Sequence, residues 1–449
     1  MFRPSAALAL SRFGLGARPG DLDALGDEPI RALLAALDGA EPASLANRLG
    51  PSDELFGQVQ DDMRQRKEMR RDGADGGERQ PNAQALIYRA ELAARIERAM
   101  TVRTGFLERL VAFWANHFAV QASTSGAVRA MAGAFEREAI RPHVAGRFED
   151  MLVAATRHPA MLLSLNNASS VGPDSRAGKR RSRGLNENHA REIMELHTVG
   201  VTAGYRQDDV IAFAKVLTGW TFGRDKSRPE FYGRFAFNRN AHEPGAQNVM
   251  GVAYRQAGEE QGLAVLSRLA ASPATARHIA EKLVRHFVAD VPPPSLVDLL
   301  ARRFLQTQGD LRAVAETLVL AGLAWSEPVT KIRSPQEFLL AALRASQISV
   351  EAPFVQRALA SLGQPLWDPP SPAGFKDETA VWLAPDAMTT RVEIAERIAA
   401  RARVKDPREQ AEAVLGDRLS RQTRQAIERA ESPTQGMTLL MMSPEFQRR

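Results

Sequence analysis

Apolar residues recur at steps of three and four along almost the whole chain, and runs that alternate apolar with polar residues are scarce. The period is clear at Leu107, Leu110, Val111 and Trp114, and similar windows follow further along the chain. Such a period is typical of amphipathic helices. The best alternating run is the short segment at residues 234–238. We therefore expect a mainly α fold, a large multi-helix globular unit with long loops, and we consider a small β-hairpin near residues 230–255.

Helix start and stop signals support this expectation. A serine followed directly by proline is typical of an N-cap residue with proline at the first helical position. Gly200 and Gly219 follow helical windows and are typical of helix ends. The Ser–Pro pairs are Ser272-Pro273, Ser334-Pro335 and Ser443-Pro444.

Composition changes along the chain suggest how it is organised. Residues 61–81 and 172–184 are rich in charge or glycine and poor in apolar residues, so we expect two mobile loops there. A proline-rich stretch at residues 364–372 must be extended or turn-like. We therefore expect a main helical unit over residues 1–360 and a C-terminal helical section over residues 361–449, packed on the same unit.

The absence of some residues and motifs narrows the possible functions. The 449-residue chain has no cysteine, which excludes disulfides, thiolate metal sites and cysteine nucleophiles. It has no Walker-A loop, no Gly-x-Gly-x-x-Gly after a strand and no Gly-x-Ser-x-Gly elbow, which weakens nucleotide-dependent and serine-hydrolase interpretations.

The charge balance and the termini are also informative. A net charge of +6 arises from 59 basic and 53 acidic residues. The basic run at residues 176–183 lacks interleaved aromatics, so nucleic-acid binding is unlikely. No apolar stretch approaches the length of a membrane span, and the N-terminal apolar run is too short for a signal peptide. The default location is cytoplasmic.

The densest group of polar residues lies at residues 185–198, which we expect to form a helix. At about 100° per residue, Asn188, Glu192 and Glu195 lie within roughly 40–60° of one another. Two carboxylates at this spacing suit a hard metal ion or proton transfer. The alternative is structural: both carboxylates pair with Arg191 or nearby basic residues. His197 points about 140° away from Glu192 on an undistorted helix.

Three histidines are candidates for a site with these acids. His117 lies in an apolar helical stripe, where a hydrogen-bonded core role competes with a ligand or base role. His197 lies in a last helical turn, where it would also satisfy terminal carbonyls. His242 precedes Glu243 on a loop, and loops often carry function.

Several segments together carry a resemblance to a known family. They include Phe113-Trp114-Ala115-Asn116-His117-Phe118, Asn186-Glu187-Asn188-His189-Ala190-Arg191-Glu192, Glu195-Leu196-His197-Thr198-Val199-Gly200, Leu217-Thr218-Gly219-Trp220-Thr221-Phe222 and His242-Glu243-Pro244-Gly245. In this order they resemble the bacterial domain-of-unknown-function 1800 family over essentially the whole chain. The resemblance implies a mostly helical fold and leaves the activity open. It also implies, at the place of His189, an aromatic or aliphatic residue in most relatives.

Two functions follow as hypotheses. The first is a metal-dependent enzyme with Arg191, Glu192 and Glu195 as catalytic residues and a divalent Zn, Mn or Fe ion. The second is a non-enzymatic partner that helps the folding or export of a sulfatase-like protein of the domain-of-unknown-function 1501 family, which the resemblance suggests as a neighbour. The protein would then reach the periplasm as a passenger of that exported partner. The expected metal ligands are His117, Glu192, Glu195, His197 and His242.

Overall fold

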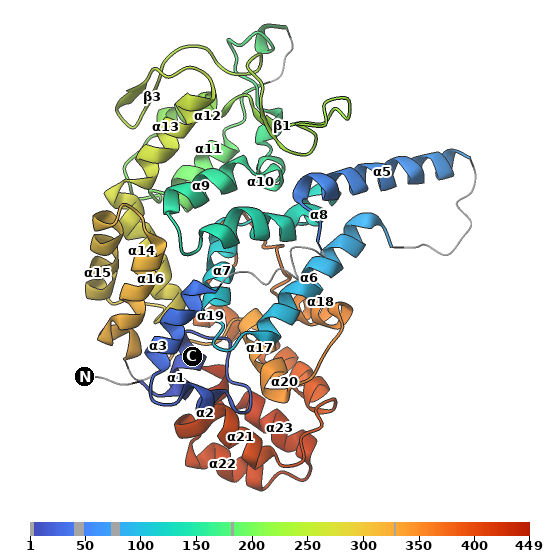
Figure 1. The fold of residues 1–449 in the computed structure, drawn as a ribbon, viewed down its shortest axis with the longest axis vertical. Helices are drawn as coiled ribbons and strands as arrows, with labels where there is room; N and C mark the ends of the chain where they lie inside the picture. Colours follow the sequence, from blue (N-terminus) through green and yellow to red (C-terminus); the bar gives the residue numbers. More distant parts are fainter. Residues whose placement is uncertain (1–3, 40–48, 73–80, 181–183, 327–328) are drawn as a thin grey trace.

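The computed structural model describes residues 4–39, 49–72, 81–180, 184–326 and 329–449. It is built almost wholly from helices, with β-strands confined to one end of the elongated molecule (Figure 1). The mainly α fold expected from the sequence is confirmed.

The first half of the chain forms the N-terminal helices, a projecting arm and the centre of the molecule (Figure 1). Helix α5 projects from the body, and α6 leads back to it. The bounds are α1 Ala6–Arg12, α2 Asp21–Leu25, α3 Pro29–Ala35, α5 Ser52–Arg71, α6 Ala83–Thr101, α7 Phe106–His117, α8 Gly126–Phe135, α9 Phe148–Arg157, α10 Pro159–Ser164, α11 Asn188–Glu192 and α12 Gln207–Leu217.

The second half passes along the other side of α7, forms the C-terminal helices at the end opposite the strands, and brings the C-terminus back beside α1 (Figure 1). The bounds are α13 Glu259–Ala270, α14 Pro273–Phe287, α15 Pro294–Gln306, α16 Leu311–Leu320, α17 Pro335–Ser346, α18 Ala352–Ser361, α19 Thr379–Trp382, α20 Pro385–Ala399, α21 Pro407–Leu415, α22 Arg421–Glu428, α23 Pro433–Met442 and α24 Pro444–Gln447.

The serine caps are confirmed in the structure. Ser272 accepts a hydrogen bond from the amide of Ala274 at the start of α14, and Ser443 accepts one from Phe446 at the start of α24. Ser334 and Glu337 form a reciprocal capping box on α17. Each cap satisfies amides that the first turn of a helix leaves free, which fixes where the helix begins.

In the described part of the chain, four short strands pair as two antiparallel hairpins. Strand β1 (Trp220–Phe222) pairs with β2 (Phe235–Phe237), and β3 (Gln247–Val249) pairs with β4 (Val252–Tyr254). The small hairpin near residues 230–255 is therefore confirmed.

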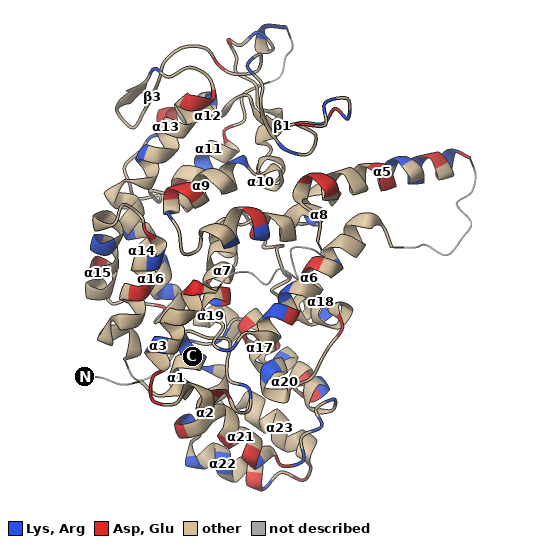
Figure 2. Cartoon of the chain, in the orientation of Figure 1, with Lys and Arg blue, Asp and Glu red and all other residues tan. Residues whose placement is uncertain are grey.

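Residues 61–71 correct one expectation, because they form the distal turns of α5 rather than a loop. This stretch lacks glycine and proline and is rich in good helix formers. Its charges also pair along the helix, with Asp61 contacting Arg64 and Asp62 contacting Arg66. The interspersed acidic and basic residues are visible in Figure 2. Residues 73–80 of the expected loop lie outside the described residues.

The second expected loop, at residues 172–184, consists of turns with one short 3₁₀ segment at Gly178–Arg180, and residues 181–183 lie outside the described part.

One large apolar core joins the central helices to both halves of the chain. Phe106, Leu110, Val111 and Trp114 on α7 are all buried in it. The ring of Phe13 packs against aromatic rings from three other segments, at centroid distances of 4.8–5.7 Å. Within the described ranges, no helix is both long enough and apolar enough to span a membrane.

Two helical segments widen into π-helical turns, at Glu136–Ile140 and at Ile193–His197. Such turns insert a residue into a helix and are frequent at functional sites. The second one follows α11 directly and includes Glu195 and His197, so the helix expected at residues 185–198 is shorter and is distorted at its end.

Candidate functional site

Helix α14 has a polar stripe at its edge. His278, Lys282 and His286 follow one another at four-residue steps, so they lie on one side of the helix. The adjoining face, which includes Ile279, Leu283 and Phe287, is buried in the core. We call His278, Lys282 and His286 the α14 stripe.

Helix α7 lies opposite this stripe and runs in the reverse direction. The Arg109 guanidinium is 3.2 Å from Nε2 of His286, and the Phe113 and His286 rings lie 5.4 Å apart. One turn beyond Phe113 on α7, the ring of His117 lies 6.2 Å from the ring of His278. Lys282 stands midway along the stripe, between these two contacts.

A cavity of about 240 Å³ opens at this place. Larger hollows exist elsewhere, such as one of about 520 Å³ beside α5, but the charged side chains that line it, including Arg224 and Lys226, are exposed. The cavity at α7 and α14 instead combines buried titratable groups with an apolar wall, which is typical of ligand sites. Its lining includes Asn116, His117, Lys282, His286, Glu337, Asp377, Phe113, Leu340, Leu366 and Trp367.

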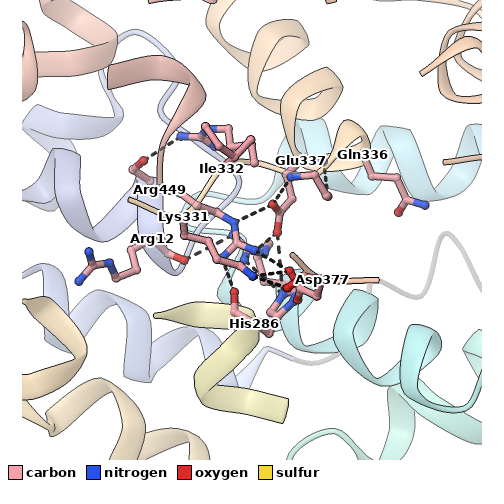
Figure 3. Close-up of polar contacts among 12 residues, drawn as sticks. Arg12, His286, Lys331, Ile332, Gln336, Glu337, Asp377 and Arg449 are labelled. Atoms are coloured by element: carbon pink, nitrogen blue, oxygen red, sulfur yellow. Dashed lines mark hydrogen bonds and ion pairs between the residues drawn. The ribbon is translucent and has the colours of Figure 1, made fainter. Parts of the chain in front are cut away.

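A network of buried charges closes one end of the cavity, around His286. Glu337 contacts Arg109 at 2.8 Å and Arg449 at 2.7 Å, and Lys331 contacts Asp377 at 2.8 Å. Figure 3 shows Lys331, Glu337 and Arg449 gathered around Asp377 and His286. We call these residues the closed end: Arg109, His286, Lys331, Glu337, Asp377 and Arg449.

The pKa values at the closed end follow from these contacts. Burial alone would raise the pKa of Glu337, but the guanidiniums of Arg109 and Arg449 outweigh it and hold the value at about 2. Burial also opposes ionisation of Asp377, yet the neighbouring His286 and Lys331 keep its pKa below the usual range. Both carboxylates are therefore ionised at neutral pH.

His286 is held at both ring nitrogens. Arg109 can only donate, so Nε2 of His286 accepts its hydrogen bond. The proton then sits on Nδ1, which donates to the carboxylate of Asp377. Burial lowers the pKa of His286, in keeping with a neutral ring. With both nitrogens occupied, this imidazole has no lone pair to offer to a ligand in the cavity.

Lys282 differs from every charge at the closed end. Among the described residues it has no hydrogen bond or ion pair, although it lines the cavity and is half-buried. Burial lowers the pKa of its amine to about 8; Asp377 raises it and Arg285 lowers it further. Lysines with such lowered pKa values serve as bases and nucleophiles in enzymes.

The imidazoles near Lys282 are neutral and incompletely paired. Nε2 of His117 donates to the carbonyl of His197 at 3.1 Å, and Nε2 of His278 donates to the carbonyl of Leu196 at 3.0 Å. Nδ1 of His117 is therefore an unprotonated acceptor, and it is buried with no partner among the described residues. Burial, with the nearby Lys282, holds the pKa values of His117, His197 and His278 below the usual range. We call Lys282, His117, His197 and His278 the open end.

The structure brings together two of the histidines expected from the sequence. The rings of His117 and His197 lie 5.9 Å apart, and both are buried. His242 lies apart from them on its loop, where Nδ1 contacts the carbonyl of Thr218 at 2.9 Å and the ring packs on Phe237.

The acidic residues of α11 and the turn after it form a separate group. Arg191 contacts Glu195 at 3.4 Å and Glu187 at 3.3 Å, and Tyr205 donates a hydrogen bond to Glu195. Burial raises the pKa of Glu192; Glu195 raises it further, and Arg191 opposes both. The ion pair with Arg191 is the contact that the structural alternative expects for Glu195, and Glu192 has no such ion pair among the described residues.

The five expected metal ligands do not form one donor set in this structure. All of them lie within the described ranges, where no group of three or more His, Asp or Glu side chains is arranged to hold a metal ion. Metal binding by these residues stays a prediction.

The sequence prediction does not include Lys282 and His286, although a local signal for them exists. His278, Lys282 and His286 recur at i, i+4 and i+8 beside the apolar face of residues 273–287. A basic and two imidazole side chains on one edge of a buried helix are a signal worth testing. Asp377 and Arg449 come from distant segments, and no local pattern places them here.

Comparison with known proteins gives one result. No curated protein and no solved structure matches the chain. A family model described as "Protein of unknown function (DUF1800)" matches residues 8–448, which is nearly the whole chain. The protein therefore belongs to the DUF1800 family of unknown function.

Proposed function

We propose that this protein is an enzyme whose reaction takes place in the cavity between α7 and α14, with Lys282 as base or nucleophile. The observation that supports this is a cavity-lining amine without an ion-pair partner among the described residues, beside a buried imidazole with an unpartnered nitrogen. Unsatisfied polar groups are costly to bury, so such a group calls for an explanation, and catalysis is one.

The chemistry follows from the protonation states. With a pKa of about 8, roughly a tenth of the Lys282 amines are neutral at pH 7. The neutral amine has the lone pair that a base or nucleophile needs. Nδ1 of His117, a residue that lines the cavity from α7, offers a second lone pair and can accept a proton. The closed end fixes α14 through His286, which positions Lys282 one helix turn away.

Competitive acetylation with acetic anhydride tests the proposal. The labelling rate of each lysine is measured by mass spectrometry between pH 6 and 11. We expect Lys282 to label with an apparent pKa near 8, and the labelling of the exposed Lys405 is followed in the same samples. If the labelling of Lys282 shows no titration near pH 8, or if Lys282 stays unlabelled in the folded protein at pH 10, the proposal fails.

A metal-dependent reaction at Glu192 and Glu195 is a second candidate. The raised pKa of Glu192 beside Glu195 supports it, because a divalent cation would relieve the repulsion between the two carboxylates. Calorimetric titration with Zn²⁺, Mn²⁺ or Fe²⁺ tests it. Binding that is lost in Glu192→Gln and kept in Glu316→Gln, a surface control, would favour this site.

A role as partner of a sulfatase-like protein has its own support. The distal turns of α5 project from the body (Figure 1), and Met63 and Met69 there are 59% and 57% exposed. Exposed methionines suit a protein-binding surface. Co-purification with the sulfatase-like protein tests this role. The wild type is compared with a Met63→Ser, Met69→Ser double variant.

A further inference from the structure

We propose that Lys282 forms an imine with a small carbonyl compound, an aldehyde or ketone of a few carbons, bound in the cavity between α7 and α14. This inference rests on the proposed function and names its substrate class. Three features of the structure carry it: an amine without an ion-pair partner among the described residues, a proton acceptor beside it, and an apolar wall around both.

Imine formation needs a nucleophile and a proton carrier at the same place. In the first step, the lone pair of the neutral Lys282 amine forms a bond to the carbonyl carbon, and the carbonyl π electrons move to oxygen. The nitrogen gives up a proton to Nδ1 of His117, and the oxygen takes up one proton from the solvent to give a neutral carbinolamine. In the second step, the hydroxyl takes the proton from His117 and leaves as water, while the nitrogen lone pair forms the carbon–nitrogen double bond of a protonated imine. No oxidant or reductant is involved.

The cavity supports the loss of water. Phe113, Leu340, Leu366 and Trp367 contribute an apolar wall, and the closed end is sealed by paired charges. Exclusion of bulk water favours a condensation that releases water and protects the product from hydrolysis. Asp377 is an electrostatic neighbour of Lys282, so it stabilises the cation when the imine nitrogen is protonated.

The size of the cavity limits the substrate. Its volume of about 240 Å³ lies just below the roughly 300–1,000 Å³ typical of ligand pockets. A carbonyl compound of a few carbons fits this space, whereas a nucleotide or a sugar chain does not. The carbonyl carbon must reach Lys282, which lies between Phe113 and His117 of the opposite helix.

Reductive trapping tests the inference on the full chain. The protein is incubated at pH 7.5 with pyruvate or with propionaldehyde, and cyanoborohydride then reduces any imine to a stable secondary amine. Peptide mass spectrometry locates the adduct. We expect adduct at Lys282 at a level at least about tenfold above that at the exposed Lys405, because the cavity holds the carbonyl compound beside the Lys282 amine and the acceptor nitrogen of His117. The two probes separate a substrate with a carboxylate from a neutral one.

Two variants sharpen the test. Lys282→Arg keeps a cation at this position and should remove the trapping, and circular dichroism checks that it folds. His117→Leu keeps Lys282 and should slow trapping at least about tenfold, with recovery when imidazole is added to the buffer. A merely structural role for His117 would not give recovery by imidazole.

The outcomes are decisive. If neither probe gives adduct at Lys282 above the level at Lys405, while acetic anhydride labels Lys282 with a pKa near 8, the imine inference falls and a base role for Lys282 stands. If acetylation also fails to single out Lys282, the proposed function falls with it.

Discussion

The closed end and the open end of the cavity differ in how their charged side chains are paired. At the closed end, each charged side chain contacts one of opposite sign: Glu337 lies between Arg109 and Arg449, and Asp377 contacts Lys331. At the open end, one helix turn away, Lys282 has no such contact among the described residues, and a ring nitrogen of His117 has no partner. The same helix, α14, supplies a residue to each end.

This difference suggests that the two ends of the cavity have different roles. Buried charges that are paired hold segments together, and removing one partner is costly because the other stays buried. Buried polar groups that are left unpaired lower stability and persist where they serve a purpose. We therefore interpret the closed end as the support and the open end as the reacting part.

The largest expected effect comes from breaking the closed end. Glu337→Ala should lower the free energy of unfolding by roughly 3–5 kcal/mol, because it leaves two buried guanidiniums without their carboxylate. Chemical denaturation measures the change. The control Glu316→Ala removes a surface pair with Arg312 and should cost at most about 0.5 kcal/mol. Equal losses in the two variants would contradict the role of the closed end.

A second prediction concerns the imidazole behind the open end. His189 is fully buried, has no partner at either ring nitrogen among the described residues, and is an electrostatic neighbour of His197. Burial lowers its pKa to about 3. This pKa lies below the value of about 6.5 that the imidazole has in the unfolded chain. The contribution of neutral His189 to the free energy of unfolding is therefore fully present above pH 6.5 and is lost as the pH falls, because the unfolded chain then takes up the proton first.

The measurement compares His189→Leu with the wild type by chemical denaturation at pH 8 and pH 5. From pH 8 to pH 5 the variant should gain about 2 kcal/mol relative to the wild type, since its unfolded chain has no such imidazole to protonate. Parallel pH profiles for the two proteins would contradict a neutral buried His189.

The smallest expected effect has the opposite sign. Lys282→Met should stabilise the protein by roughly 1–2 kcal/mol at pH 7, because it removes a charge that burial penalises. The folded-state pKa of about 8 lies below that of the unfolded chain, so the gain should shrink as the pH rises above 8. The control Lys376→Met, at an exposed position, should change little. A loss of stability in Lys282→Met would mean that this amine belongs to the support.

The sequence predicts the fold better than the site. Period and capping signals placed helices such as α7, α14 and α17 correctly, because both signals are local. The loop prediction for residues 61–71 is wrong because dense charge does not distinguish a loop from a helix whose charges pair at helical spacing. The angle between Glu192 and His197 assumed a regular helix, and the π-helical turn at Ile193–His197 removes that assumption.

The site depends on contacts that no local pattern contains. His278, Lys282 and His286 were readable as one edge of a helix, but the meaning of that edge comes from α7 across the cavity and from Asp377 and Arg449 far along the chain. Burial decides the pKa of Lys282, and burial is a property of the finished fold. Sequence patterns alone could propose the stripe but not its chemistry.

Arg449 at the closed end has a consequence for biosynthesis. Its side chain reaches Glu337 and the backbone carbonyl of His286, so the closed end stays incomplete until residue 449 has left the ribosome. Helices α5, α6 and α8 pack mainly on one another and can assemble during translation, as can α14 with α15, whereas the contact of Arg449 with the end of α14 joins segments more than 150 residues apart. During that interval the nascent chain exposes buried carboxylates and aromatic rings, and a ribosome-associated chaperone would have its longest opportunity to bind there.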